Sequence, residues 1–191
     1  MSELLQLGSD EMKAWKHFCT ITRHKLLVMK SCFKVGLYKQ GILHDLSKYG
    51  YTEFHLGCKY YLGTESPHNG ERRDYGYSLA WLHHKGCNKH HLEYWLDYGP
   101  DKEDGIIGMK MPKKYVVEMF LDRVCASKNY QKERYTDASA WEYYEKGRNH
   151  LILYPDTRAL LEKLLLMLKE EGEEKTFTYV KNTVMKKEFS Y

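Results

Sequence analysis

The sequence has few prolines, no long apolar run and almost no excess of one charge, and each absence excludes a class of protein. With only four prolines and no Pro-, Gly- or Ser-rich linker, residues 1–191 are expected to form one domain. No stretch reaches the ~18 consecutive apolar residues of a membrane span, and the acidic start MSELLQLGSDEMK is unlike a secretory signal. We therefore expect a cytoplasmic protein without membrane contact.

Charge and cysteine content narrow the possible partners. The chain carries 30 basic and 26 acidic residues, so its formal net charge of +4 gives no strong indication of nucleic-acid binding. Five cysteines without CxxC spacing are typical of reduced thiols rather than of a disulfide framework. A small anionic substrate remains possible, because it requires only a local basic pocket.

Apolar residues recur at helical spacing through most of the chain. The predicted helices cover residues 10–36, a short segment around His44, and residues 52–62, 77–85, 88–98, 112–130, 139–146, 155–171 and 175–189. The polar segments 63–76 and 99–111 are predicted loops because they are rich in Gly, Pro, Asn and charge. The sequence therefore predicts an all-α bundle of about seven to nine helices, with C-terminal helices over 139–189 packing on a core at 10–130.

The stretch GILHDLSKYG carries the first chemical signal. His44 and Asp45 can chelate a metal ion, and Lys48, one turn on, would direct a cation toward whatever the metal holds. Further ligand types occur along the chain: His24 lies in an apolar segment before this stretch, and Asp122 lies in the apolar-periodic segment VVEMFLDRVCASK. Together these residues predict a metal site built from separate helices.

Two His–His pairs lie in WLHHKGCNKHHLEYW, on either side of a predicted helix break at residues 86–88. The break would let two helix ends converge on one ion, so we choose His84 and His91 as ligands. His83 and His90 are the alternatives, supporting the ligands or contacting substrate. Cys87 is a further possible ligand. The competing interpretation is that all four histidines are solvated residues flanking a turn.

In chain order these residues are His, His-Asp, His, His and Asp, which resembles the HD superfamily of metal-dependent phosphohydrolases. The HDLSK run looks like that family's HD-x-x-K signature, and the similarity covers roughly residues 10–130. The chain looks closest to a bacterial and phage group without an assigned activity, which shares the HH-x-x-x-N-x-HH run and a segment like YPDTR at 154–158. The resemblance implies an all-α fold with a metal site in its core.

The resemblance also implies roles for individual residues. One or two divalent transition metals (Mn, Fe, Co, Ni or Zn) would be held by a set of six side chains: His24, His44, Asp45, His84, His91 and Asp122. Two ions would lie about 3.5 to 4 Å apart, bridged by Asp45 and a hydroxide. The predicted catalytic residues are Asp45, Lys48, His83 and His90, and the predicted substrate-binding residues are Lys48, Arg123 and Lys128. Arg148 and Arg158 are weaker candidates for closing the pocket.

The expected reaction is hydrolysis of a phosphoester in a nucleotide or a related small phosphorylated metabolite by a metal-activated hydroxide. A di-iron oxygenase that cleaves C–C or C–P bonds, and a non-catalytic nucleotide-binding protein, are the alternatives. Structural interpretations also exist: a buried Asp45 or Asp122 could pair with Arg23 or Arg123, and His24 could be a hydrogen-bonded core residue. The remaining histidines are assigned to structural or surface positions: His17, His55, His68 and His150.

Overall fold

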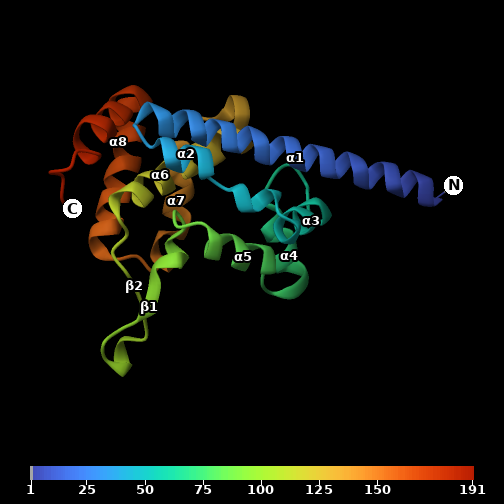
Figure 1. Ribbon diagram of the computed structural model, residues 1–191, viewed down its shortest axis with the longest axis horizontal. Coiled ribbons are helices and arrows are strands. Elements are labelled where there is room, and N and C mark those ends of the chain that lie inside the picture. Colours follow the sequence, from blue (N-terminus) through green and yellow to red (C-terminus); the bar gives the residue numbers. More distant parts are fainter. Residues whose placement is uncertain (1) are drawn as a thin grey trace.

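The computed structural model describes residues 2–191, with side chains described from Glu11 onward. Over these residues the chain forms eight α-helices: α1 Ser2–Lys34, α2 Tyr38–Leu43, α3 Tyr51–Lys59, α4 Pro67–Tyr75, α5 Leu79–Cys87, α6 Lys113–Gln131, α7 Ser139–Gly147 and α8 Pro155–Tyr179. The predicted all-α class is confirmed (Figure 1). Short 3₁₀ turns η1 (Leu46–Tyr49) and η2 (Leu92–Trp95) and the antiparallel strands β1 (Leu96–Tyr98) and β2 (Ile106–Gly108) complete the part of the fold that positions the site.

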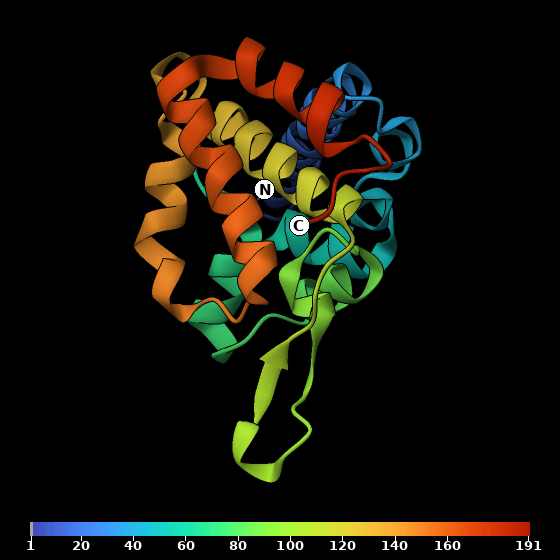
Figure 2. The ribbon, with the colours of Figure 1, turned by 90° about the vertical axis from the view of Figure 1, so that its left-hand side faces the viewer.

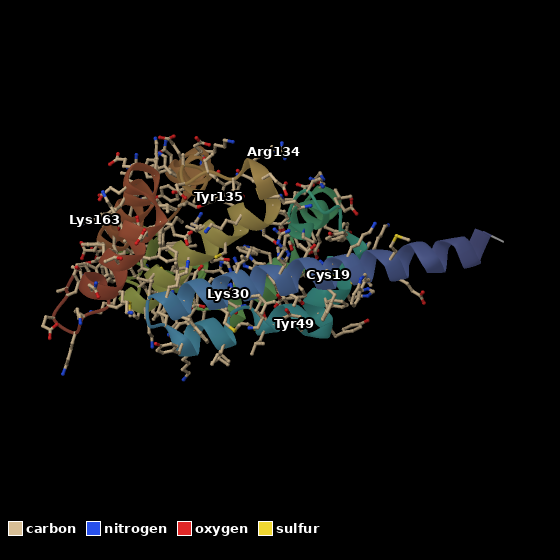
Figure 3. All side chains as sticks on the ribbon, turned by 90° about the horizontal axis from the view of Figure 1, so that it is seen from above. Cys19, Lys30, Tyr49, Arg134, Tyr135 and Lys163 are labelled. Carbon is tan, nitrogen blue, oxygen red and sulfur yellow. The ribbon has the colours of Figure 1, made fainter. Side chains whose placement is uncertain are left out.

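Helix α1 is the longest element, and its N-terminal end extends past the other helices (Figure 1). Its buried residues include His17, Ile21, His24 and Val28, which recur every three or four positions and therefore lie on one face. Cys19 and Lys30 are exposed, and helical spacing places them on the opposite side of α1, where Figure 3 labels them. The position of His24 on the buried face directs its ring into the protein.

Helix α6 forms the centre of the hydrophobic core, between α1 and α8 (Figure 2). It is buried on nearly all sides, and α8 contributes a row of leucines against it. The fully buried apolar residues of these two helices include Val116, Val117, Phe120, Leu121, Val124, Leu161, Leu164, Leu165 and Leu168. Glu118, a carboxylate on α6, therefore lies where little water reaches it.

Helix α8 bends at Gly172, whose φ of 83° and ψ of 171° are not helical. Glycine adopts this backbone conformation without the steric cost that a side chain would impose. Directly after the bend, Glu173 pairs with Lys34 of α1, 3.0 Å away, and with Lys128 of α6. The bend matches the predicted separation of helices 155–171 and 175–189.

Three local predictions are wrong. The predicted loop 63–76 contains α4, which starts at Pro67, ends at Tyr75 and is followed by Gly76 in the left-handed conformation. The predicted helix 88–98 is a turn followed by η2 and β1, and the predicted loop 99–111 contains β2. Strands β1 and β2 form a hairpin that projects from the bundle (Figure 2). None of the helices between residues 2 and 191 combines the length and apolar character needed to cross a membrane.

Candidate metal centre

His44 and Asp45 lie at a junction between two helical segments rather than inside one helix, which corrects the predicted short helix around His44. Helix α2 ends at Leu43, and Asp45 adopts a left-handed conformation with φ 54° and ψ 25° before η1 begins. Neighbouring residues of a continuous α-helix point about 100° apart, so the junction is what allows both side chains to face one point. A left-handed non-glycine residue costs roughly 1 kcal/mol or more, and such strained residues cluster at functional sites.

Close packing holds this junction against α1. A Cβ atom on Gly41 of α2 would lie 3.0 Å from Cβ of Cys32 and 3.1 Å from the carbonyl oxygen of Met29. Only a residue without a side chain allows α2 to approach α1 this closely. In addition, Lys25 of α1 donates to the carbonyl oxygen of His44 at 2.8 Å. The backbone of the His-Asp pair is thus positioned from the side of α1.

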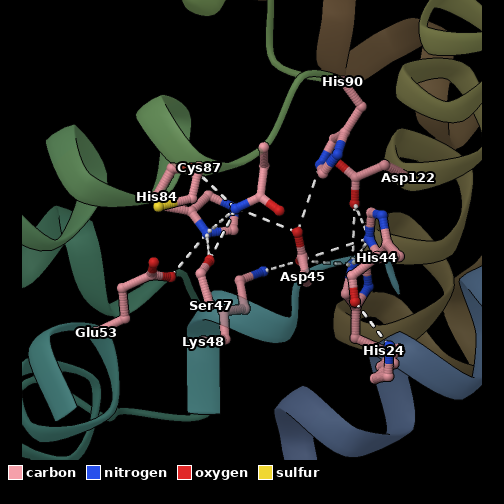
Figure 4. Close-up of polar contacts among 12 residues, drawn as sticks. His24, His44, Asp45, Ser47, Lys48, Glu53, His84, Cys87, His90 and Asp122 are labelled. Atoms are coloured by element: carbon pink, nitrogen blue, oxygen red, sulfur yellow. Dashed lines mark hydrogen bonds and ion pairs between the residues drawn. The ribbon is translucent and has the colours of Figure 1, made fainter. Parts of the chain in front are cut away.

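The first cluster contains His24, His44, Asp45 and Asp122, from α1, the α2–η1 junction and α6. Nε2 of His24 lies 2.9 Å from Oδ1 of Asp122. Nε2 of His44 lies 3.4 Å from Oδ2 of Asp45 and 3.6 Å from Oδ1 of Asp122. Each residue offers one nitrogen or oxygen, and these atoms all lie within 4.8 Å of one another (Figure 4). The cluster could hold a metal ion.

The second cluster contains Asp45, His84, His90 and His91. Nε2 of His84 and Nε2 of His90 each lie 3.4 Å from Oδ1 of Asp45 (Figure 4). His84 lies in the last turn of α5, and the chain turns back after Cys87 to bring the second His–His pair toward the same carboxylate. Asp45 belongs to both clusters, with one oxygen toward each.

Four buried polar atoms in the second cluster lack a hydrogen-bond partner among the described residues. They are Oδ1 of Asp45 and Nε2 of His84, His90 and His91. Buried polar atoms are almost always paired, so a group of orphaned acceptors that converge requires an explanation. An imidazole nitrogen and a carboxylate oxygen are both ligands for divalent transition metals, and such an ion would satisfy all four atoms. The residues therefore fit a bound metal.

Two buried glutamates orient the histidine rings. Oε1 of Glu118 on α6 accepts from Nδ1 of His44 at 3.1 Å and lies 3.3 Å from Nδ1 of His90. Oε2 of Glu53 on α3 accepts from Nδ1 of His84 at 2.7 Å. With the proton assigned to Nδ1, Nε2 presents its lone pair to Asp45, which is the arrangement that metal-binding histidines commonly use. Glu118 also joins His44 and His90 in a third group of possible ligands.

The local electrostatics keep the acidic residues ionised. Burial opposes the ionisation of Asp45, yet the positive charges of His44 and Lys48 hold its pKa well below the usual value. Burial likewise opposes the ionisation of Asp122, but hydrogen bonds from His24 and His44 hold its pKa well below the usual value. Burial lowers the pKa of His91, so this ring is neutral. Ionised carboxylates and neutral imidazoles are the ligand forms of these side chains.

Before any metal binds, the acidic groups around His44 favour its protonated form. Burial alone would lower the pKa of His44, but Asp45, Asp122 and Glu118 together raise it to about 10. A metal at the first cluster would compete with this proton for Nε2. Binding of the metal and release of the proton are therefore coupled.

Lys48 lies where the sequence predicted a cation. Its Nζ is 2.6 Å from Oδ2 of Asp45, and 23% of its side chain is exposed. Burial opposes the charge on Lys48, but Asp45 and Asp122 raise its pKa above the usual value, so it stays protonated. The site thus carries a fixed ammonium group on its edge.

The two remaining predicted catalytic histidines differ in position. His90 lies in the second cluster beside His91, so the predicted division between His91 as ligand and His90 as catalytic residue does not separate them. His83 points outward, with 41% of its side chain exposed and Nδ1 bonded to Glu53 at 2.7 Å.

The structure places the predicted substrate contacts Arg123 and Lys128 outside the two clusters. The Arg123 guanidinium lies 5.5 Å from the ring centre of Tyr144, and Lys128 pairs with Glu173. Arg123 is one residue from Asp122 and Lys128 six residues from it, so both point to other sides of α6. Arg148 and Arg158 also lie outside the clusters, in a network around Glu162.

Glu53 and Glu118 were missed as functional residues by sequence reasoning. Glu118 gives a weak signal, because it is charged within the apolar run VVEMF one turn before Asp122. Glu53, in TEFHLG, gives none, since most glutamates of this kind face solvent. Asn88 also contributes to the site, because its side-chain amide donates to Ser47 at 2.8 Å and lies beside His84.

Comparison with known families places the chain in one of them. The model of a family described as "Family of unknown function (DUF5662)" matches residues 13–167, a stretch that includes every residue of both clusters. The chain belongs to this family. Neither the curated proteins nor the solved structures contain a match to it. Because the function of the family is unknown, membership of it gives no role to the residues of the two clusters.

Proposed function

We propose that this protein is a metal-dependent phosphohydrolase that acts on a small phosphorylated metabolite, such as a nucleotide. The observation that carries the proposal is the contact of Lys48 Nζ with Oδ2 of Asp45, a carboxylate shared by both metal-ligand clusters. A fixed cation beside a metal site suits a substrate that brings two or more negative charges. A neutral substrate would not be stabilised by the charge of Lys48.

The donor atoms support a particular class of metal. The clusters combine several imidazole nitrogens with the carboxylates of Asp45 and Asp122. Mixed nitrogen and oxygen ligands suit Mn, Fe, Co, Ni or Zn rather than Ca or Mg. When bound, such an ion supplies an activated water at neutral pH and polarises phosphoryl oxygens. Because Asp45 belongs to two clusters, the donor set accommodates one ion or two.

Exposure indicates the side from which the substrate approaches. The side chains of His44, His84 and His90 are 0–2% exposed, whereas Asp122 is 17% and Lys48 23% exposed. Lys48 and Asp122 thus form the open edge of the site. A phosphoryl group entering there meets the Lys48 ammonium first, which would orient it and neutralise charge that builds on its oxygens. The buried histidines behind it are oriented by Glu118 and Glu53.

The proposal is tested with purified protein prepared without chelator. Bound metals are quantified, and phosphate release is measured on a panel of nucleoside mono-, di- and triphosphates, cyclic nucleotides and small phosphorylated metabolites. Asp45→Asn keeps the size of the side chain but removes the charge shared by both clusters, so we expect loss of bound metal and of phosphate release. Asp156→Asn is the matched control, because Asp156 pairs only with exposed Lys110 in the contacts described.

Phosphate release that Asp45→Asn leaves unchanged would overturn the proposal. Bound iron with oxygen uptake and without phosphate release would favour the alternative oxygenase chemistry. Nucleotide binding without turnover in the metal-loaded protein would favour a binding protein. Each outcome is read from the same preparation.

A further inference from the structure

A second group of ligand-type side chains lies on the outer face of α5. His83 and Cys87 are one helical turn apart, and both are exposed. Sγ of Cys87 lies 3.8 Å from Nε2 of His83 and 4.0 Å from Nδ1. Neither residue belongs to the clusters around Asp45. This pair faces solvent, whereas His84, the next residue along the helix, faces inward.

Glu53 orients the ring of His83 in the same way as it orients the ring of His84. Its two carboxylate oxygens are divided between the two rings, with Oε1 2.7 Å from Nδ1 of His83 and Oε2 2.7 Å from Nδ1 of His84. Since Nδ1 of His83 is engaged by Glu53, Nε2 is the ring nitrogen left free, and it is also the one nearer the sulfur. A buried carboxylate that fixes a histidine in this way is a common support for a metal ligand.

The spacing of the two donor atoms suits one shared ion. Zn²⁺ binds thiolate sulfur at about 2.3 Å and imidazole nitrogen at about 2.0 to 2.1 Å in tetrahedral geometry, which separates the two donors by about 3.5 Å. The observed separation of 3.8 Å is close to this value and lies between side chains on adjacent turns of one helix. Because Sγ is also 4.0 Å from Nδ1, the sulfur lies to the side of the Nε2 lone pair, and the exposed Cys87 side chain has to rotate to share an ion with Nε2.

We propose that Cys87 and His83 form a separate, solvent-facing site for a thiophilic divalent ion such as Zn²⁺ or Co²⁺. Binding replaces the thiol proton of Cys87, which is released to solvent, and forms one metal–sulfur and one metal–nitrogen bond. Water completes the coordination, so the ion remains exchangeable. Glu53 links this outer site to the inner clusters, because its carboxylate orients His83 at the outer site and His84 at the second cluster.

Cobalt titration tests the proposal on the full chain under reducing, oxygen-free conditions. A thiolate bound to Co²⁺ gives a near-ultraviolet charge-transfer band, which imidazole and carboxylate ligands do not give. We expect this band to appear in the wild-type protein and to be lost in Cys87→Ser. Cys19→Ser is the matched control, because Cys19 is also an exposed free thiol but lies on α1, and it should retain the band.

Two further variants separate the outer site from the inner one. His83→Ala should weaken the cobalt affinity reported by the thiolate band by about tenfold or more, while the visible bands of cobalt at the inner clusters persist. Glu53→Gln should weaken both sets of bands, since Glu53 orients His83 and His84.

The absence of a thiolate band in the wild type would overturn the proposal. Its persistence in Cys87→Ser would do the same, as would an unchanged affinity in His83→Ala. These readouts do not involve phosphate release. The outer site and the proposed hydrolytic function can therefore fail independently.

Discussion

Glu118 accepts a hydrogen bond from Nδ1 of His44 at 3.1 Å, while Nε2 of the same ring faces Asp45. The same carboxylate oxygen lies 3.3 Å from Nδ1 of His90, so one buried glutamate orients a histidine in each of the two clusters. Loss of this charge should disturb both clusters while leaving every proposed ligand in place.

Glu118→Gln should therefore weaken metal binding by about 10- to 100-fold. Glutamine keeps the size of the side chain and an acceptor oxygen, but it removes the charge that makes both rings better ligands. Affinity is measured by competition with a chromophoric chelator. Glu162→Gln is the control, because Glu162 pairs with Arg148 and Tyr144 away from the clusters. Equal affinities for the Glu118 variant and the wild type would remove the proposed role of Glu118.

Lys48→Ala should lower kcat/KM for phosphate release by about 100-fold and leave the bound metal in place. The ammonium contacts Asp45 from the exposed edge of the site. Its removal therefore takes away a positive charge that would face the substrate, but it removes no metal ligand. Lys48→Arg should retain part of the activity, because it keeps the charge with a different shape.

The control for this prediction is Lys110→Ala, since Lys110 is exposed and pairs with Asp156. Metal analysis of each variant distinguishes lost catalysis from lost metal. If Lys48→Ala hydrolyses the substrate as fast as the wild type, the ammonium does not act on the phosphoryl group.

Gly57→Ala should destabilise the protein by about 1 to 3 kcal/mol. A Cβ atom on Gly57 of α3 would lie 2.2 Å from Nε2 of His17 on α1, so the buried His17 ring would have to shift from its packed position. Urea unfolding followed by circular dichroism measures the change. Gly86→Ala on α5 is matched to it, because a Cβ there meets no atom within 4 Å and alanine favours the helix by up to about 1 kcal/mol. The prediction fails if both variants shift the midpoint in the same direction.

Sequence patterns predicted the helices and candidate ligands that depend on local features of the sequence. Apolar spacing located α1, α6 and the bend in α8, because core helices repeat their buried residues every three to four positions. The residues that can bind metals stand out in sequence since histidine pairs and an adjacent His-Asp are rare, and His24, His44, Asp45 and Asp122 do lie together.

Tertiary contacts decided the rest. Residues 67–75 look polar in sequence, yet they form α4 because Gly70 packs on Tyr60 and Glu71 accepts from Ser78 at 2.5 Å. Similarly, a glutamate that orients a histidine looks like any helical glutamate until the distant ring is placed beside it. Which histidine of a pair faces inward depends on the turn after Cys87, which spacing alone does not define.

Acid should destabilise the metal-free protein partly through His17. This residue is 5% exposed, and burial, assisted by the charge of Lys48, lowers its pKa from 6.5 to about 4. Between these values the folded protein keeps His17 neutral while the unfolded chain takes up a proton. Stability is therefore lost as the pH falls from 6.5 to about 4, by at most about 3 kcal/mol from this residue.

His17→Gln should flatten this part of the stability curve, even if its stability at neutral pH is lower. Urea unfolding is measured across the same pH range, with chelator present so that metal binding does not add its own pH dependence. His55→Gln is the control, because His55 is exposed and stacks on Tyr51, and it should keep the slope of the wild type. Parallel curves for His17→Gln and the wild type would show that His17 is not the buried group that takes up the proton on unfolding.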